Sequence, residues 1–477
     1  MKRKILTLML TAAMAVSFAS GCTKNEKTAD GGITKLTWIV PVSEQADSAA
    51  VLTEANKIIE EKIGANLEMV FIDPSSYSER MKMNMASENA YDLCFTSNWL
   101  NSYESAVESE GLMEITDYIS DNLKSMIPDY VLDQAKIDGK LYAVPNIQVM
   151  THPCSLRIQR SLAEKYNLDT STIKSIKDIE PFFAQVKAGE PDIYPFRTTW
   201  GEGPWTRPVY EEVYNNSNVL IRKDGTGKLV IDYETPEYQE AIKTLRDWYQ
   251  KGYIRSDVAS AGNDTAGWNA GKYAADISTW KPGLEAIDKA QGYDYVYIPL
   301  HDPYMARDGA LQAMIGVGAN SKNPEKAVEL IELMNTDKEL YNLICYGIKD
   351  KHYTLDSENK VTTIDKSGYA PGRDWVFGNQ FNAYVPANAD SDVWQKTEEM
   401  NENSIKSPLI GFTPDISAIR TELSQLSSVI DEYSYQTTGA YDPAEYWDDF
   451  VQKMETAGQK KVLEELQKQV DEFLASK

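Results

Sequence analysis

The first part of the chain alternates between strand-like and helix-like spacing of apolar residues. Residues 36–40 form a short apolar strand pattern, and residues 51–63 place apolar side chains three and four positions apart, as on one face of a helix. A second strand pattern covers 67–72, and a helix pattern at 77–87 leads to a third short strand at 92–95. This βαβαβ order predicts an α/β fold that opens with a parallel sheet and right-handed crossovers.

Two loops follow the first and third of these strands, at 41–45 and 96–99. Ligands of open α/β sheets bind beyond the carboxyl ends of the strands, which is where both loops fall. The loops supply hydrogen-bonding side chains from Glu44 and Asn98 and the aromatic plane of Trp99. We therefore expect these three residues to bind a ligand.

Turn and helix patterns continue through the rest of the chain. Apolar stretches flank a glycine-containing turn at 224–228, which predicts a hairpin, and 236–252 carries apolar and aromatic residues on one helical face. Asn323 stands at the N-cap position of a further helix, and a second helix follows it and ends near Gly347. The tail at 463–474 has the pattern of an amphipathic helix, and the sequence shows no repeat at a fixed period.

The N-terminal residues have the order of a secretory signal. Basic residues at 2–4 precede an apolar stretch at 5–18, too short to span a bilayer comfortably, and then Ala-Ser-Gly before Cys22. The junction resembles a bacterial lipobox, which implies a lipoprotein signal peptide over 1–21 and an acylated Cys22 that anchors the chain to the membrane. The polar residues 22–32 are typical of a flexible tether. The alternative is an ordinary signal whose cleavage leaves Cys22 without a role.

Charge and composition narrow the class of function. The formal net charge of −24 repels nucleic acid and anionic lipid surfaces, so no nucleic-acid partner is expected. Removal of a signal leaves about 450 residues, too many for a single hydrophobic core, which predicts two lobes. The chain has 10 Trp and 28 Tyr but only 3 His, a balance that favours stacking on a ligand over imidazole catalysis or metal binding.

Enzyme and metal motifs are missing from the sequence. It contains no His-Glu-x-x-His, no Gly-x-Ser-x-Gly, no Walker loop, no Gly-x-Gly-x-x-Gly opening a helix and no EF-hand loop. The histidines, His152, His301 and His352, are far apart, so we expect no metal site, no catalytic residue and no cofactor. The carboxylate pair of a glycoside hydrolase stays open, because spacing among 72 acidic residues does not reveal their geometry.

Cysteine spacing implies no disulfide framework. Beyond Cys22 the cysteines are Cys94, Cys154 and Cys345, all far apart in sequence. We expect three buried thiols, with one bridge and one free thiol as the alternative.

Several segments occur in an order that resembles a known family. They are the signal with its cysteine, the βαβ opening, 111–119, 138–145, 271–280 and 321–327. Together they resemble family 1 extracellular solute-binding proteins over the whole mature chain. Residues 340–348 and 377–381 are similar to the lipoprotein subgroup that has a C-terminal region of unassigned function.

The resemblance implies a two-lobe periplasmic-binding-protein-like fold, with a ligand cleft between lobes that are joined by hinge segments. Lobe 1 is expected to contain 33–147 and 302–350, and lobe 2 to contain 148–301 and 351–477. The crossings between the lobes are expected near 146–149, near 299–303 and after Gly347.

The resemblance also implies a function and partners. The implied function is that of the binding lipoproteins of ABC importers, which capture a solute on the extracellular face of the membrane and act as monomers. These proteins deliver the solute to permease subunits that are powered by a separate ATPase. A carbohydrate, and within that class an oligosaccharide, is the expected ligand. A peptide or other polar metabolite is the alternative ligand, and a secreted glycoside hydrolase or a surface adhesin is the alternative class of protein.

Tryptophans are the candidate platforms for a sugar, because an indole covers the apolar C–H face of a pyranose. In the family pattern the aromatic residue that closes 271–280 reaches the cleft, and that place is Trp280. Trp38 lies within a strand pattern and is expected in the core. The further candidates for ligand binding are Trp99, Trp200, Trp205, Trp268 and Trp375.

Overall fold

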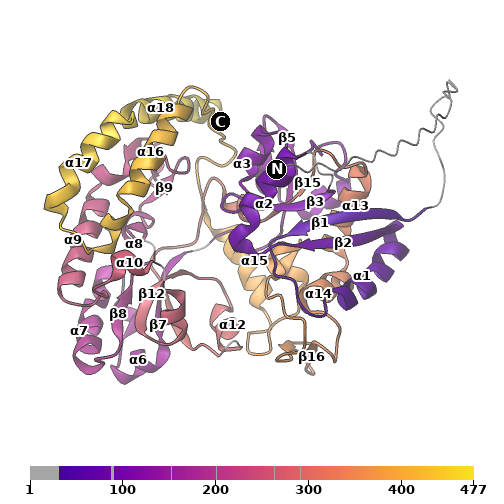
Figure 1. Cartoon of the computed structure of the whole chain (residues 1–477), viewed down its shortest axis with the longest axis horizontal. Coiled ribbons are helices and arrows are strands. Elements are labelled where there is room, and N and C mark those ends of the chain that lie inside the picture. The colour runs from indigo at the N-terminus through magenta and orange to yellow at the C-terminus, as the bar shows by residue number, and fades with distance from the viewer. Residues whose placement is uncertain (1–31, 88–90, 152, 200, 263, 291) are drawn as a thin grey trace, which may run out of the picture.

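The computed structural model describes residues 32–87, 91–151, 153–199, 201–262, 264–290 and 292–477. The expected signal peptide, Cys22, almost all of the tether, His152 and Trp200 lie outside these residues. The described chain forms two α/β lobes side by side (Figure 1). Among the described residues, no helix combines the length and the apolar composition that a membrane span needs.

Lobe 1 is built on a five-stranded sheet whose first three strands are parallel, as the βαβαβ pattern predicts. In spatial order the strands are β2 (Ala65–Phe71), β1 (Thr34–Val40), β3 (Leu93–Thr96), β15 (Met314–Val317) and β6 (Ala143–Pro145). The connecting helices are α1 (Ser48–Ile63) and α2 (Pro74–Ala86). Gly64 ends α1 in the left-handed region at φ 64°, and the Asp73 carboxylate caps α2 by accepting from the backbone N–H of Ser75.

Two later helices, α13 (Pro324–Thr336) and α14 (Lys338–Tyr346), also belong to lobe 1. Asn323 precedes α13 as predicted, but among the described contacts its side chain makes no capping hydrogen bond to that helix. The Asn323 side-chain amide instead donates to Asp92 Oδ1 at 3.4 Å. The shorter elements of this lobe are α3 (Tyr103–Glu108), α4 (Asp121–Met126), α5 (Asp129–Ala135), β4 (Lys136–Ile137) and β5 (Lys140–Leu141).

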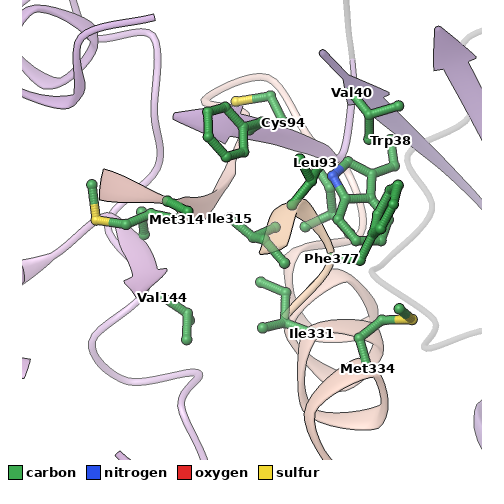
Figure 2. Packing of buried hydrophobic residues seen from close by; sticks show 14 of the residues in the cluster. Trp38, Val40, Leu93, Cys94, Val144, Met314, Ile315, Ile331, Met334 and Phe377 are labelled. Carbon is green, nitrogen blue, oxygen red and sulfur yellow. The ribbon is translucent and has the colours of Figure 1, made fainter. Parts of the chain in front are cut away.

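The core of lobe 1 includes residues from the later part of the chain. Trp38 is fully buried, and the Phe377 ring packs edge-on against it with 5.8 Å between ring centroids (Figure 2). Val376 and Ala383 belong to the same core. The expected assignment of all of 351–477 to lobe 2 therefore differs from the structure, in which this segment first returns to lobe 1.

Lobe 2 has a four-stranded sheet and a smaller three-stranded sheet. The first contains, in order, β13 (Tyr295–Pro299), β7 (Cys154–Gln159), β12 (Tyr273–Thr279) and β8 (Tyr194–Arg197). The second contains β11 (Leu229–Ile231), β10 (Val219–Arg222) and β9 (Tyr210–Glu212), in which β10 and β11 form the predicted hairpin. The helices are α6 (Arg160–Lys165), α7 (Glu180–Gly189), α8 (Gly203–Thr206), α9 (Pro236–Gln250), α10 (Val258–Ala261), α11 (Thr265–Asn269) and α12 (Leu284–Ala290).

Three C-terminal helices complete lobe 2: α16 (Arg420–Glu432), α17 (Pro443–Thr456) and α18 (Gln459–Ser476). Their buried residues form one hydrophobic core with the three-stranded sheet and part of α9. The Gln467 amide oxygen accepts from the backbone N–H of Leu229 at 2.8 Å, so α18 also supplies hydrogen bonds to β11. The C-terminal region is thus part of the lobe and not an appendage (Figure 1).

Three chain segments cross between the lobes and lie next to one another. The second and third pair as short parallel strands, β14 (Tyr304–Met305) and β18 (Ile405–Lys406). Asn401, in α15 (Val393–Asn403), binds the first crossing through the backbone N–H of Met150 at 2.8 Å. These contacts tie all three crossings into a single hinge region.

The third crossing lies near 404–408 and not directly after Gly347 as expected. After Gly347 the chain stays in lobe 1, where the buried His352 ring contacts Asp47 Oδ2 at 3.0 Å. The hairpin β16 (Tyr353–Leu355) and β17 (Val361–Thr363) follows. Polar contacts to the start of α1 therefore hold this segment against lobe 1.

The three cysteines after the N-terminal region are buried and free, which confirms the prediction of three buried thiols. They are Cys94, Cys154 and Cys345. Burial raises the pKa of the Cys94 and Cys154 thiols to about 12, as expected for inert core residues.

Candidate functional site

A cavity of about 1040 Å³ lies between the two lobes. Its volume is at the upper end of the range for small-molecule sites, about 300–1,000 Å³, so it has room for more than one sugar ring. Lobe 1 contributes Asn98, Trp99, Asp308, Gln312 and Trp375. Lobe 2 contributes Glu202, Arg207, Glu212, Asn215, Lys223, Asp232 and Lys281, and the first crossing adds Gln148, Val149 and Met150.

The lobe 1 wall presents two tryptophans side by side. The rings of Trp99 and Trp375 have centroids 6.0 Å apart at an interplanar angle of 49°, and both pack against Phe95. The Trp99 indole N–H donates to the carbonyl oxygen of Gln312 at 2.9 Å, which fixes the ring although 58% of the residue is exposed. The result is a rigid aromatic surface in the cavity wall.

Asn98 lies beside this surface and is held in place by lobe 1. Its amide donates to Asp308 Oδ2 at 2.9 Å, and its backbone N–H donates to the carbonyl of Leu311 at 2.8 Å. Its side-chain oxygen is buried and accepts no hydrogen bond from the described protein atoms. A ligand donor would satisfy that oxygen.

The lobe 2 wall is charged. Glu202, Arg207, Glu212 and Asp232 all line it. Burial raises the pKa of Glu212 to about 7, although the nearby Arg207 guanidinium opposes the shift. The pKa values of Glu202 and Asp232 are also raised by burial.

Lys223 and His301 line the cavity next to the second crossing. The Lys223 ammonium lies 4.0 Å from the centroid of the Tyr304 ring and donates to the carbonyl of Arg207 at 2.6 Å, and burial lowers its pKa to about 8. His301 Nε2 accepts from the backbone N–H of Cys154 at 3.0 Å. Nδ1 lies 2.7 Å from the carbonyl oxygen of Asp302, so the neutral ring that donates from Nδ1 satisfies both contacts.

His301 should make the protein less stable in mild acid. Burial lowers its pKa to about 4, below the unfolded value of about 6.5, so its contribution is complete above about pH 6.5 and is lost as pH falls toward 4. Between about pH 7 and about pH 5, denaturant unfolding should show the wild type losing about 1–2 kcal/mol more than His301→Gln. Equal losses in the two proteins would contradict this role.

Glu211 ties the hinge to lobe 2. Its buried carboxylate accepts hydrogen bonds from the Tyr304 hydroxyl at 2.7 Å and the Ser407 hydroxyl at 2.5 Å, one on each of two crossings. The backbone N–H of Arg307 donates to the same carboxylate. Because Glu211 also lines the cavity, the cavity wall and the second and third crossings share one hydrogen-bond network.

The structure brings three of the expected site residues together and separates the others. Asn98, Trp99 and Trp375 line the cavity. Glu44 is exposed in the loop after β1 and lies outside the cavity lining. In the same loop the Ser43 hydroxyl donates to Asp73 at 3.0 Å.

The remaining described tryptophans pack elsewhere. Trp205 is 6% exposed in the core of lobe 2, and Trp268 is 4% exposed beneath the Arg157 guanidinium, 4.3 Å from the ring centroid. Trp280 packs against the aromatic cluster that contains Trp268. Its neighbours Thr279 and Lys281 line the cavity instead, as expected from the alternation of side chains along an extended segment.

The charged wall was not predicted from the sequence. Glu212 ends a short strand, Asn215 lies in the amide-rich turn that follows it, and Asp232 directly follows another strand. Polar residues placed where short strands end are a usable signal for a site. Among 72 acidic residues this signal does not stand out.

Comparison with known proteins is consistent with a binding cavity. A family profile described as bacterial extracellular solute-binding protein matches residues 54–344, and a domain of unknown function, DUF3502, matches 408–475. A carbohydrate ABC transporter substrate-binding protein of Streptococcus pneumoniae is 27% identical over 95% of this chain and 94% of its own length. A polygalacturonan/rhamnogalacturonan-binding protein of Bacillus subtilis is 22% identical over 97% of this chain and 98% of its own length.

Solved structures agree over nearly the full length. The N-glycan transport solute binding protein of Streptococcus pneumoniae has a TM-score of 0.82 and 26% identity, covering 93% of this chain and 99% of that one. Its complex with Man5GlcNAc has a TM-score of 0.76 and 26% identity, covering 94% and 99%. The family profile spans more than half of the 477 residues, and the fold is that of the solved relatives. This chain therefore belongs to the family of bacterial extracellular solute-binding proteins.

Proposed function

We propose that this protein is the extracellular receptor of a bacterial ABC importer and that it captures an oligosaccharide in the cavity between its lobes. The names of its relatives support a carbohydrate ligand, since one is a carbohydrate ABC transporter substrate-binding protein and another is solved with Man5GlcNAc. In this proposal the protein acts as a monomer and hands the ligand to membrane permease subunits. It holds the ligand without cleaving it.

The observation that carries the proposal is the Trp99 and Trp375 surface opposite a polar wall. A pyranose has an apolar C–H face that covers an indole and a rim of hydroxyls that needs hydrogen-bonding side chains. Lobe 1 offers the indoles and lobe 2 offers carboxylates, amides and cations across the cavity. A cavity of about 1040 Å³ favours several linked sugars over one.

The proposal is tested by calorimetric titration and thermal unfolding with a panel of neutral, amino, acetylated and acidic oligosaccharides and peptides. A ligand at 100 times its Kd adds about 2.7 kcal/mol to the stability of the folded state. We expect at least one oligosaccharide class to stabilise the protein, to be recovered uncleaved, and to reduce the radius of gyration in solution scattering as the lobes close. Stabilisation by peptides alone, or cleavage of the bound glycan, would refute it.

We also propose that the mature chain is held at the membrane by lipid on Cys22, as the lipobox-like junction indicates. Cys22→Ala should release the protein into the medium or leave it as uncleaved precursor, because no acyl chain can be attached. Cell fractionation followed by mass determination of the N-terminus distinguishes these forms. A processed Cys22→Ala protein that stays in the membrane fraction would argue against the anchor.

A further inference from the structure

The lobe 2 wall gathers three carboxylates from three separate elements. Glu202 immediately precedes α8, Glu212 is the last residue of β9, and Asp232 directly follows β11. The β-sheet register explains the meeting of the last two, because Glu212 pairs with Leu220 and Ile231 pairs with Val219, so both strands reach the same end of β10. All three carboxylates line the cavity.

Asp232 is the buried member of this group. Only 9% of the residue is exposed, and its Oδ1 has no hydrogen-bond partner among the described protein atoms. Its backbone is fixed on both sides, since its N–H donates to the carbonyl of Asn218 at 2.9 Å and its carbonyl accepts from the Thr235 hydroxyl at 2.7 Å. A buried carboxylate oxygen that lines a cavity and lacks a partner needs a donor from the ligand.

In this group three carboxyl groups have one nearby cation among the described residues, Arg207. Burial raises the pKa of all three carboxyl groups, repulsion from Glu202 and Glu212 adds to the shift at Asp232, and the Arg207 guanidinium opposes the shift in each. Glu212 gains one backbone hydrogen bond, from Asn216 at 3.0 Å. Three carboxyl groups with raised pKa values share this wall with one nearby guanidinium, so a cation on the ligand would shift them toward the ionised form that accepts hydrogen bonds.

We infer that this carboxylate group is a subsite for a protonated amine, so that the captured glycan carries an unacetylated amino sugar. The inference rests on the proposed function and narrows its ligand class. A sugar hydroxyl donates a single hydrogen bond and brings no charge, whereas an ammonium donates three and is positive. Charge-assisted hydrogen bonds to buried carboxylates are the stronger kind, so the wall selects an amine over a hydroxyl or an acetamide.

The test compares the β-1,4-linked glucosamine tetramer with its N-acetylated counterpart by calorimetric titration. The titrations are made at about pH 6, because the electron-withdrawing ring oxygens lower the pKa of sugar amines and a mildly acidic solution keeps most of them protonated. We expect the amino tetramer to bind at least tenfold more tightly. Asp232→Asn and Glu212→Gln, which keep the side-chain shape, should each reduce that preference at least fivefold without lowering the melting temperature.

Glu234→Gln is the matched control, because Glu234 is an exposed carboxylate in the same turn and is outside the cavity lining. It should keep the full preference. Equal binding of the two tetramers, absence of binding by the amino tetramer, or full preference in both cavity variants overturns the inference. Binding of another oligosaccharide in that case leaves the proposed function standing, whereas binding of none overturns both.

Discussion

A chain that ends at Ser407 should fail to fold its second lobe. Truncation removes α16, α17 and α18, which provide much of the core shared with the three-stranded sheet, including the fully buried Val462, Leu466 and Val470. A three-stranded sheet that loses its covering helices exposes a large apolar face and aggregates. Expression should yield insoluble protein or a product from which limited proteolysis leaves only lobe 1 fragments.

Point variants in α18 test whether the buried side chains of this helix, and not merely the length of the chain, stabilise the lobe. Leu466→Ala should lower the free energy of unfolding by about 2–5 kcal/mol, because a fully buried leucine is replaced by a cavity. Glu464→Ala is the control on the exposed face of the same helix and should change it by less than about 0.5 kcal/mol. A soluble truncated chain with wild-type proteolytic stability would show that the C-terminal region is dispensable for the lobe.

The second large effect is expected on ligand affinity. Trp99→Ala and Trp375→Ala should each weaken oligosaccharide binding about thirtyfold. A sugar that covers half of an indole of about 150–250 Å², at about 25 cal/mol per Å², gains about 2 kcal/mol. Since about 1.4 kcal/mol is a factor of ten, titration calorimetry can measure the loss directly.

The fold should tolerate the Trp99 substitution, because more than half of that residue is already exposed. Trp205→Ala is the contrasting variant: its buried side chain packs with Trp248 at 6.0 Å between ring centroids, so its loss should cost about 3–5 kcal/mol of stability. Titration calorimetry measures the change in affinity of each variant, and denaturant or thermal unfolding measures its change in stability. Normal affinity of Trp99→Ala and Trp375→Ala would exclude the indoles as a sugar platform.

Patterns within short stretches of sequence predicted the helices and strands whose formation depends mainly on neighbouring residues. The spacing of apolar residues predicted a helix over 51–63, and α1 ends where predicted but begins three residues earlier, at Ser48. The glycine-containing turn correctly predicted the hairpin of β10 and β11. Asn98 and Trp99 were identified because they follow β3, at the edge of the sheet where ligands bind. Whether these two residues bind the ligand stays a prediction.

Contacts between segments that are far apart in the chain could not be predicted from the sequence. Phe377 joins lobe 1 because its partner is Trp38, near the other end of the chain, and no local pattern records that pairing. The tryptophans are alike in sequence, so burial of Trp205 and exposure of Trp99 depend on what packs against each. For the same reason the third crossing was expected too early in the chain.

The late position of Phe377 has a consequence for the order of folding. Lobe 1 begins at β1 but lacks a wall of its core until Phe377 has been synthesised, and lobe 2 lacks its own until Val470 is present. Contacts this far apart in sequence fold slowly, because long loops must close before they are stabilised. The growing polypeptide therefore has no finished lobe before Phe377 and no second lobe before Val470, which favours the unfolded state that passage through a narrow translocation channel requires.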